Sequence, residues 1–134
     1  MPKSTLSRLM LVLAWAALAL IAYATLTRVQ FVYVIYGRMK PFLLGASAQT
    51  WAHIEHIVAF GTAGVLFAVA YPRRPFLACL IVTASAVLFE VLQTLTPDRH
   101  GTLIDASEKI VAGCLGVALA VLARRSWLAR RAPR

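Results

Sequence analysis

The sequence predicts an all-α integral membrane protein, a bundle of four membrane-spanning helices with both termini in the cytoplasm. Apolar residues make up 60% of its 134 residues and charged residues only 14%, against about 45–50% and about 25% in soluble domains. Four apolar runs approach the roughly 20 residues that a helix needs to cross a bilayer. A soluble chain of this length has too small an interior for so much apolar surface, so we place the protein in lipid.

Two features of the composition point to other classes of protein but fit a membrane protein better. A net charge of +9 is typical of nucleic-acid binding. The arginines, however, cluster beside the apolar runs, and no aromatic residues alternate with them to form a binding strip. Cys79 and Cys114 each lie inside an apolar run without C-x-x-C spacing, which indicates small buried side chains. We expect no nucleic-acid partner and no redox or zinc motif.

The first expected span covers residues 9–27. Its basic start at Lys3 and Arg8 and the small-x-small pattern Ala22-Tyr23-Ala24 also fit a secretory signal peptide. The apolar stretch is longer than the about 7–15 residues of a signal peptide's central region. We therefore expect this helix to be retained.

The second and third expected spans, residues 54–71 and 76–95, flank the turn Pro72-Arg73-Arg74-Pro75. Pro97 ends the third span, because proline cannot continue a helix.

The fourth expected span covers residues 103–123. It is purely apolar only over residues 110–123, so it reaches spanning length only if it begins near Leu103. Thr102-Leu103-Ile104-Asp105 has the pattern of a capping box, which supports that start. We expect one domain, with residues 124–134 as a basic cytoplasmic tail.

Charged residues predict the orientation. With four spans, the N-terminus, the turn before the third span and the C-terminal tail share one side of the membrane. Nine of the 14 lysines and arginines lie there, namely Lys3, Arg8, Arg73, Arg74, Arg124, Arg125, Arg130, Arg131 and Arg134. The positive-inside rule places that side in the cytoplasm. All five acids and all three histidines lie on or near the other side, where we expect the function.

The segment 28–51 joins the first two spans on the extracytoplasmic side. It is too apolar for a free loop and too short to span the membrane twice. Its aromatic residues suit the level of the lipid headgroups. We expect an interfacial or re-entrant segment that caps the polar residues below it.

Glu90 and Gln93 are the first candidate site residues. They are three residues apart, so they share one face of the third span. Glu90 lies about five residues from the helix end, or roughly 7–8 Å deep at 1.5 Å per residue. A carboxylate at that depth must be protonated, paired or in contact with water. Arg99, in the following turn, could bridge to Glu90 or Asp105, or hold an anionic headgroup.

One face of the fourth span carries polar residues at its extracytoplasmic end and small residues along the rest of its length. These residues are Asp105, Lys109, Ala112, Gly116 and Ala120. Small residues allow helices to approach closely in lipid, and Gly61 and Gly64 serve the second span in the same way. We expect the fourth helix to be central, with Lys109 able to pair with Asp105 at i,i+4.

Several motifs in this order resemble the VanZ-like family over roughly residues 50 to 120. They are His56-x-x-x-Phe60, Glu90-x-x-Gln93, Pro97-x-Arg99 and then Asp105 before a glycine-rich helix. That family comprises small multi-helix membrane proteins named for a glycopeptide (teicoplanin) resistance factor. The resemblance implies a bacterial cytoplasmic membrane and a role in the cell envelope. The chain departs from the family pattern at Ala52 and His53, where members often carry an acid-lysine pair, and at Lys109, where asparagine is usual.

His53 and His56 raise the question of a metal. They lie at i,i+3 and could direct both imidazoles at one ion, with Glu90 or Asp105 completing the site. Only His56 fits the family pattern, and a metal centre would not lose a ligand freely. We therefore assign no metal and no cofactor, and expect His56 to face inward while His53 and Glu55 face the headgroups.

The leading functional hypothesis is a non-catalytic or accessory protein whose extracytoplasmic polar pocket binds an amphiphile. The ligand could be a membrane lipid, a lipid-linked envelope precursor or a lipoglycopeptide drug, and the partner could be a second copy or an envelope enzyme. The expected binding residues are His56, Glu90, Gln93, Arg99, Asp105 and Lys109.

Two alternatives remain open. An intramembrane enzyme on a lipid-linked substrate would use His56 or Glu90 as general base, with Arg99 stabilising negative charge. A proton-coupled transporter or flippase component would use Glu90 as the titrating group. Thr83 and Ser85, the polar residues in the inner half of the third span, make a poor relay and argue against transport by a monomer.

Overall fold

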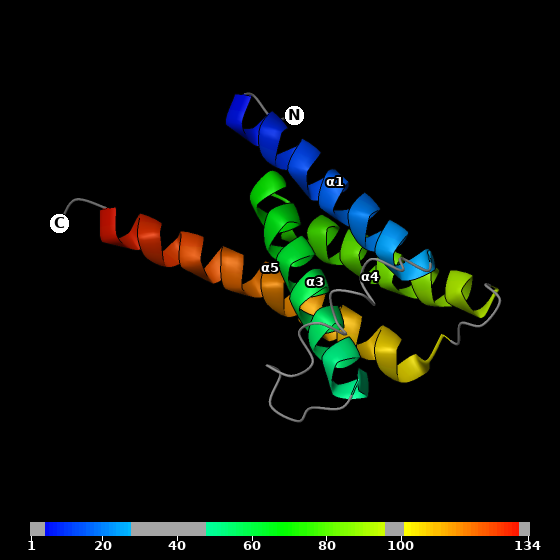
Figure 1. Cartoon of the computed structure of the whole chain (residues 1–134). Coiled ribbons are helices and arrows are strands. Elements are labelled where there is room, and N and C mark those ends of the chain that lie inside the picture. Colours follow the sequence, from blue (N-terminus) through cyan, green and yellow to red (C-terminus); the bar gives the residue numbers. More distant parts are fainter. Residues whose placement is uncertain (1–4, 28–47, 96–100, 132–134) are drawn as a thin grey trace.

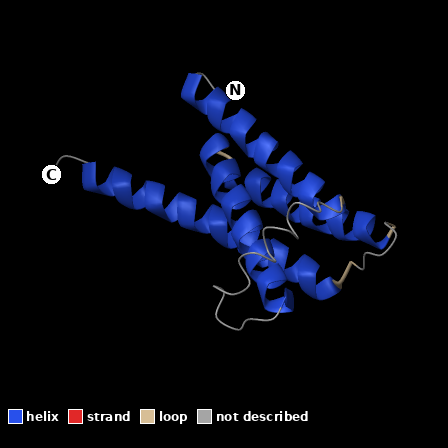
Figure 2. Cartoon of the chain, in the orientation of Figure 1, coloured by secondary structure: helices blue, strands red, loops and turns tan. Residues whose placement is uncertain are grey.

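The computed structural model describes residues 5–27, 48–95 and 101–131, and all the regular structure in these ranges is helical (Figure 2). The helices are α1 (Thr5–Leu26), α3 (Ala48–Ala70), α4 (Pro75–Thr94) and α5 (Leu103–Arg131), arranged as in Figure 1. Each is long and apolar enough to cross a membrane, which agrees with the four predicted spans and supports a multi-pass membrane protein. Residues 28–47 of the expected interfacial segment lie outside the described residues.

Two helices are longer than their apolar runs. Helix α3 begins at Ala48 rather than near residue 54, and α5 continues to Arg131 rather than ending near residue 123. Polar residues are compatible with a helix, whereas proline, and glycine at the C-terminal cap, commonly mark its end. The sequence has neither between Ala48 and Phe60, nor between Gly116 and Pro133. The basic tail is therefore helical through Arg131.

The crossing of α3 and α5 forms the centre of the bundle. A Cβ atom added at Gly64 would lie 2.1 Å from the Gly113 carbonyl oxygen, and one at Gly116 would lie 2.1 Å from that of Gly61. The two backbones therefore touch, as small residues permit in lipid. Helices α3 and α4 each contact the three other described helices, and α5 contacts α3 and α4. The most extensive contact is the one between α3 and α5, so the fourth span shares the centre of the bundle with α3.

Aromatic rings and small side chains fill the remaining interfaces. Trp15 of α1 packs edge-on against Phe67 of α3, with ring centroids 5.2 Å apart. Phe60 of α3 meets Phe89 of α4 in the same manner at 6.2 Å. Many large apolar side chains instead point outward on all four helices, among them Leu20 and Leu119. Such a surface is suited to lipid rather than to water.

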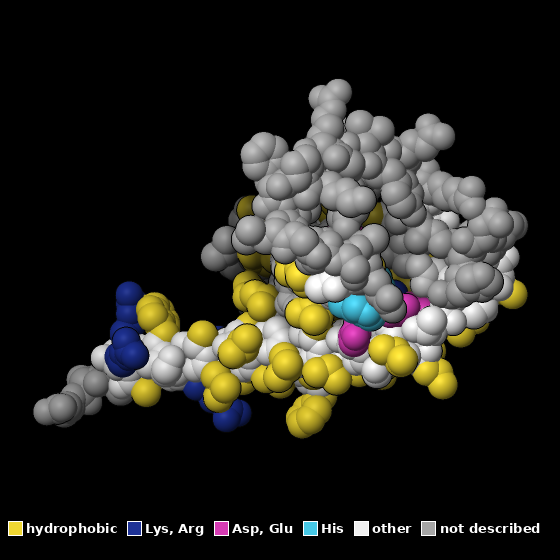
Figure 3. All heavy atoms as spheres, turned by 60° about the horizontal axis from the view of Figure 1, so that its bottom comes forward, with side chains coloured by type: hydrophobic (Ala, Val, Ile, Leu, Met, Phe, Trp, Pro, Cys, Tyr) yellow, Lys and Arg dark blue, Asp and Glu magenta, His cyan; other side chains and the backbone are white. Residues whose placement is uncertain are grey.

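The two ends of the bundle differ in chemistry (Figure 3). At the basic end, the Arg124 guanidinium donates to the carbonyl of Pro72, and Arg131 lies 4.0 Å from the centre of the Trp127 ring. Acidic and histidine side chains gather at the other end. This separation is the one that the sequence predicts, and the orientation of the two ends across the membrane remains a prediction.

Candidate functional site

A buried ion pair lies at the base of the polar end. Lys109 of α5 is completely buried and donates from Nζ to Oε1 of Glu90 on α4, whose residue is only 6% exposed. A charge buried without a partner is costly, so two opposite charges at this depth are stable only together. We call Glu90 and Lys109 the buried pair.

The second carboxylate oxygen of Glu90 caps helix α5. The backbone N–H of Thr102 donates to Glu90 Oε2 at 2.9 Å, and Thr102 Oγ1 accepts from the N–H of Asp105 at 3.0 Å. In a capping box the acid at the position of Asp105 would accept the first of these bonds. Here Glu90 accepts it, so the predicted capping box is half confirmed. The carboxylate of Asp105 is therefore available to other partners.

Gly101 makes this arrangement sterically feasible. A Cβ atom there would lie 2.3 Å from the backbone carbonyl oxygen of Glu90. The chain entering α5 thus packs directly on α4, which brings the N–H of Thr102 to the Glu90 carboxylate.

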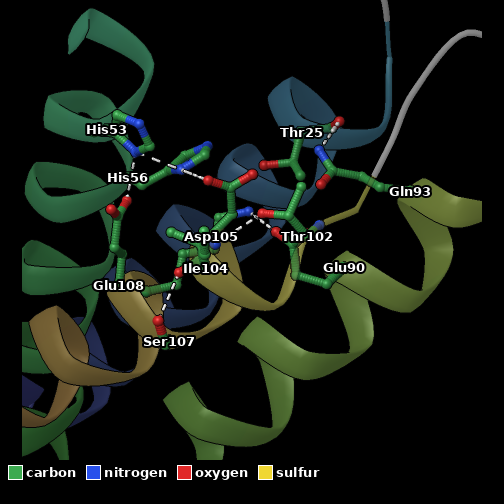
Figure 4. A network of polar contacts seen from close by, with 11 residues as sticks. Thr25, His53, His56, Glu90, Gln93, Thr102, Ile104, Asp105, Ser107 and Glu108 are labelled. Atoms are coloured by element: carbon green, nitrogen blue, oxygen red, sulfur yellow. Dashed lines mark hydrogen bonds and ion pairs between the residues drawn. The ribbon is translucent and has the colours of Figure 1, made fainter. Parts of the chain in front are cut away.

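Above the buried pair, a polar face of α3 meets a polar face of α5 (Figure 4). His53 Nδ1 lies 2.7 Å from Glu108 Oε2 and 3.8 Å from Asp105 Oδ1, and His56 Nδ1 lies 3.9 Å from the same Asp105 oxygen. These four side chains, which we call the mouth cluster, are each between 23% and 33% exposed. They are accessible from the end of the bundle, unlike the buried pair.

The mouth cluster is not internally satisfied. His56 Nδ1 is buried and has no hydrogen-bond partner among the described residues. A buried polar atom without a partner costs about 1–3 kcal/mol. His56 also interacts electrostatically with both members of the buried pair and with both acids of the mouth cluster. The cluster therefore has an atom positioned for a ligand that the described chain does not supply.

Gln93 contacts α1 rather than the buried pair or the mouth cluster. Its side chain is buried and its amide donates to the backbone carbonyl of Thr25 at 3.2 Å. This bond ties the last turn of α1 to α4. Gln93 and Glu90 are both buried on α4, in keeping with their spacing, but Gln93 bonds to α1 whereas Glu90 bonds to α5.

Two sequence expectations are wrong. His53 was expected to face the headgroups, yet it bonds to Glu108, a residue that the sequence analysis left out of the site. The i,i+3 spacing contained the signal, since an inward His56 brings His53 to the same face, and Asp105 and Glu108 share that spacing. Lys109 was expected to pair with Asp105 and to belong to the ligand-binding residues, but its ammonium donates to Glu90.

The remaining predicted site residue, Arg99, lies outside the described residues, as does His100. A contact between Glu90 and Arg99 therefore stays a prediction. Both Glu90 oxygens already have partners, which makes this carboxylate a poor general base or transport group.

Searches of protein-family models, of curated proteins and of solved structures find no significant match to the chain. The resemblance to the VanZ-like family therefore rests on the sequence motifs alone.

Proposed function

We propose that the chain is a VanZ-like, multi-pass protein of the bacterial cytoplasmic membrane that binds the polar headgroup of an amphiphile on the extracytoplasmic side. The ligand would be a membrane lipid or a lipid-linked envelope precursor, whose tails lie along the apolar outer faces of the helices. The observation that carries the proposal is the mouth cluster, a group of partly exposed and incompletely bonded polar side chains at one end of an otherwise apolar bundle.

The side chains of the mouth cluster limit the kinds of headgroup that it can bind. The ammonium of Lys109 is paired with Glu90, so the described part of the site offers carboxylates and imidazoles to a ligand rather than a free cation. Carboxylates accept hydrogen bonds, and a neutral imidazole nitrogen accepts them too. The headgroup that fits carries donors, either hydroxyl groups as in a sugar or an ammonium group. Lys109, which the sequence analysis placed among the ligand-binding residues, is therefore not proposed as one.

A transport path has less support. In the described part of α4, the hydroxyl of Ser85 donates to the carbonyl of Ile81, and that of Thr83 lies 3.8 Å from Cys114 Sγ. These bonds are local and do not connect the mouth cluster to the basic end. The role in glycopeptide resistance that the resemblance implies would follow from headgroup binding, because drug and precursor meet at the outer leaflet.

The proposal is tested by mass spectrometry of the lipids that remain bound after purification in a mild detergent. We expect one headgroup class to be enriched over the bulk membrane lipid, and the enrichment to be lost in Asp105→Asn. Glu55→Gln is the matched control, because Glu55 is an exposed acid on the same stretch of α3. Lipid that mirrors the bulk membrane in all three proteins would refute the proposal.

A further inference from the structure

The mouth cluster has the composition of a transition-metal site. It presents two imidazole nitrogens and two carboxylates, and three of its members, His53, Asp105 and Glu108, have ligand atoms all within 4.8 Å of one another. We propose that His53, His56, Asp105 and Glu108 bind one divalent transition-metal ion, with Zn²⁺ the best match. The ion would occupy the same four side chains as a headgroup, so the two ligands would compete for the cluster. The ion proposal goes beyond headgroup binding and does not depend on it.

The spacing along the two helices suits chelation. His53 and His56 lie three residues apart on α3, and Asp105 and Glu108 lie three residues apart on α5. Residues at i,i+3 project from one helix face, and metal sites within helical bundles are built from such pairs on facing helices. Figure 4 shows the two pairs directed toward each other.

The distances are also close to those around an ion. A tetrahedral Zn²⁺ with bonds of about 2.0–2.1 Å holds its ligand atoms about 3.3 Å apart. The three measured nitrogen–oxygen separations are 2.7, 3.8 and 3.9 Å, which bracket that value. Small side-chain rotations would bring His53, Asp105 and Glu108 to coordination distance, whereas His56, which lies outside that group of three, would have to move further to become the fourth ligand.

Charge and hydrogen bonding favour the ion as well. Two carboxylates balance the charge of a divalent cation, whereas the buried pair is neutral as a unit and leaves them uncompensated. His56 Nδ1, which lacks a hydrogen-bond partner among the described residues, would gain a bond to the ion. His53 would exchange its hydrogen bond to Glu108 for a metal bond, with its proton on Nε2. Mixed imidazole and carboxylate ligands suit Zn²⁺ better than Mg²⁺, which prefers oxygen.

This inference reverses the sequence-based assignment of no metal, and the structure supplies the reason. That assignment treated His53 as a headgroup-facing residue and did not consider Glu108. With His53 and Glu108 2.7 Å apart, the cluster has four candidate ligands instead of an isolated pair of histidines.

The test uses the full-length protein, free of any polyhistidine tag, stripped with chelator in detergent and titrated with Zn²⁺ or Co²⁺ without added lipid. We expect one ion per chain and, for Co²⁺, the intense visible absorption of a tetrahedral site. Glu108→Gln and His53→Gln should weaken binding by at least about tenfold, since even loss of an outer-shell partner costs about 10–100-fold. Glu55→Gln should bind as the unmodified protein does.

Three results would overturn the proposal. They are uptake of well under one ion per chain by the unmodified protein, an octahedral Co²⁺ spectrum, and equal affinity in Glu108→Gln and Glu55→Gln. His100→Asn is a further control, and a loss of binding confined to that variant would place the ion elsewhere. Failure here leaves the proposed lipid binding intact, because the titration contains no lipid ligand.

Discussion

The buried pair makes a sharp energetic prediction, because Lys109 is completely buried and its ammonium donates to Glu90. In Glu90→Gln the amide oxygen can still accept from the Thr102 N–H, but the ammonium of Lys109 loses its counter-charge. Breaking a buried pair in this way costs about 3–5 kcal/mol. Lys109→Met should cost less, because the remaining Glu90 carboxylate keeps its bond from Thr102 and can take up a proton.

The double variant Glu90→Gln/Lys109→Met removes both charges and keeps the shapes of the side chains. Replacing a buried pair by groups of similar volume is often neutral or stabilising. The double variant should therefore be more stable than Glu90→Gln alone. We expect a coupling energy of about 2–3 kcal/mol, in the upper part of the range for residues in contact.

The assay is equilibrium unfolding in mixed micelles with a rising fraction of SDS, followed by helical circular dichroism. A parallel cycle with Arg99→Ala tests the alternative cation. Additive stabilities for Glu90 and Lys109, or a larger coupling between Glu90 and Arg99, would refute the assignment of Lys109 as the partner.

Two further predictions concern packing and orientation. Gly64→Ala should destabilise the protein by about 1–3 kcal/mol in the same assay, because its Cβ would lie 2.1 Å from the Gly113 oxygen. Gly61→Ala should be mild, because its nearest contact would be at 3.7 Å. Equal effects of the two substitutions would contradict the close crossing of α3 and α5. In a background without Cys79 and Cys114, an impermeant thiol reagent should label Leu103→Cys in intact cells and spare Ser126→Cys, since Leu103 is 90% exposed at the acidic end. The reverse labelling pattern would contradict the proposed orientation.

The sequence predicted the spans well, because length and hydropathy decide whether a helix can cross a membrane. It also predicted that α5 starts at Leu103, since the bond between Thr102 and Asp105 is local in sequence. It predicted neither that α3 starts at Ala48 nor that α5 continues to Arg131, because polar residues extend a helix without leaving an apolar signal.

The partners of the site residues were harder to predict. Lys109 and Glu90 lie on different helices, so their contact depends on how α4 and α5 pack, and local spacing favoured Asp105 instead. The pairing of His53 with Glu108 likewise depends on the crossing of α3 and α5. The equal i,i+3 spacing of the two pairs was nevertheless present in the sequence, and it would have identified the mouth cluster had both helix faces been compared.

The central claim is that the mouth cluster binds a ligand while the buried pair maintains the fold. Native mass spectrometry of the intact protein released from detergent tests it most directly, by counting the lipids that stay bound per chain. We expect bound lipid on the unmodified protein and on Glu55→Gln, and its loss from Asp105→Asn/Glu108→Gln, a variant that should otherwise fold normally. Equal lipid occupancy in the folded double variant and the unmodified protein would contradict the account.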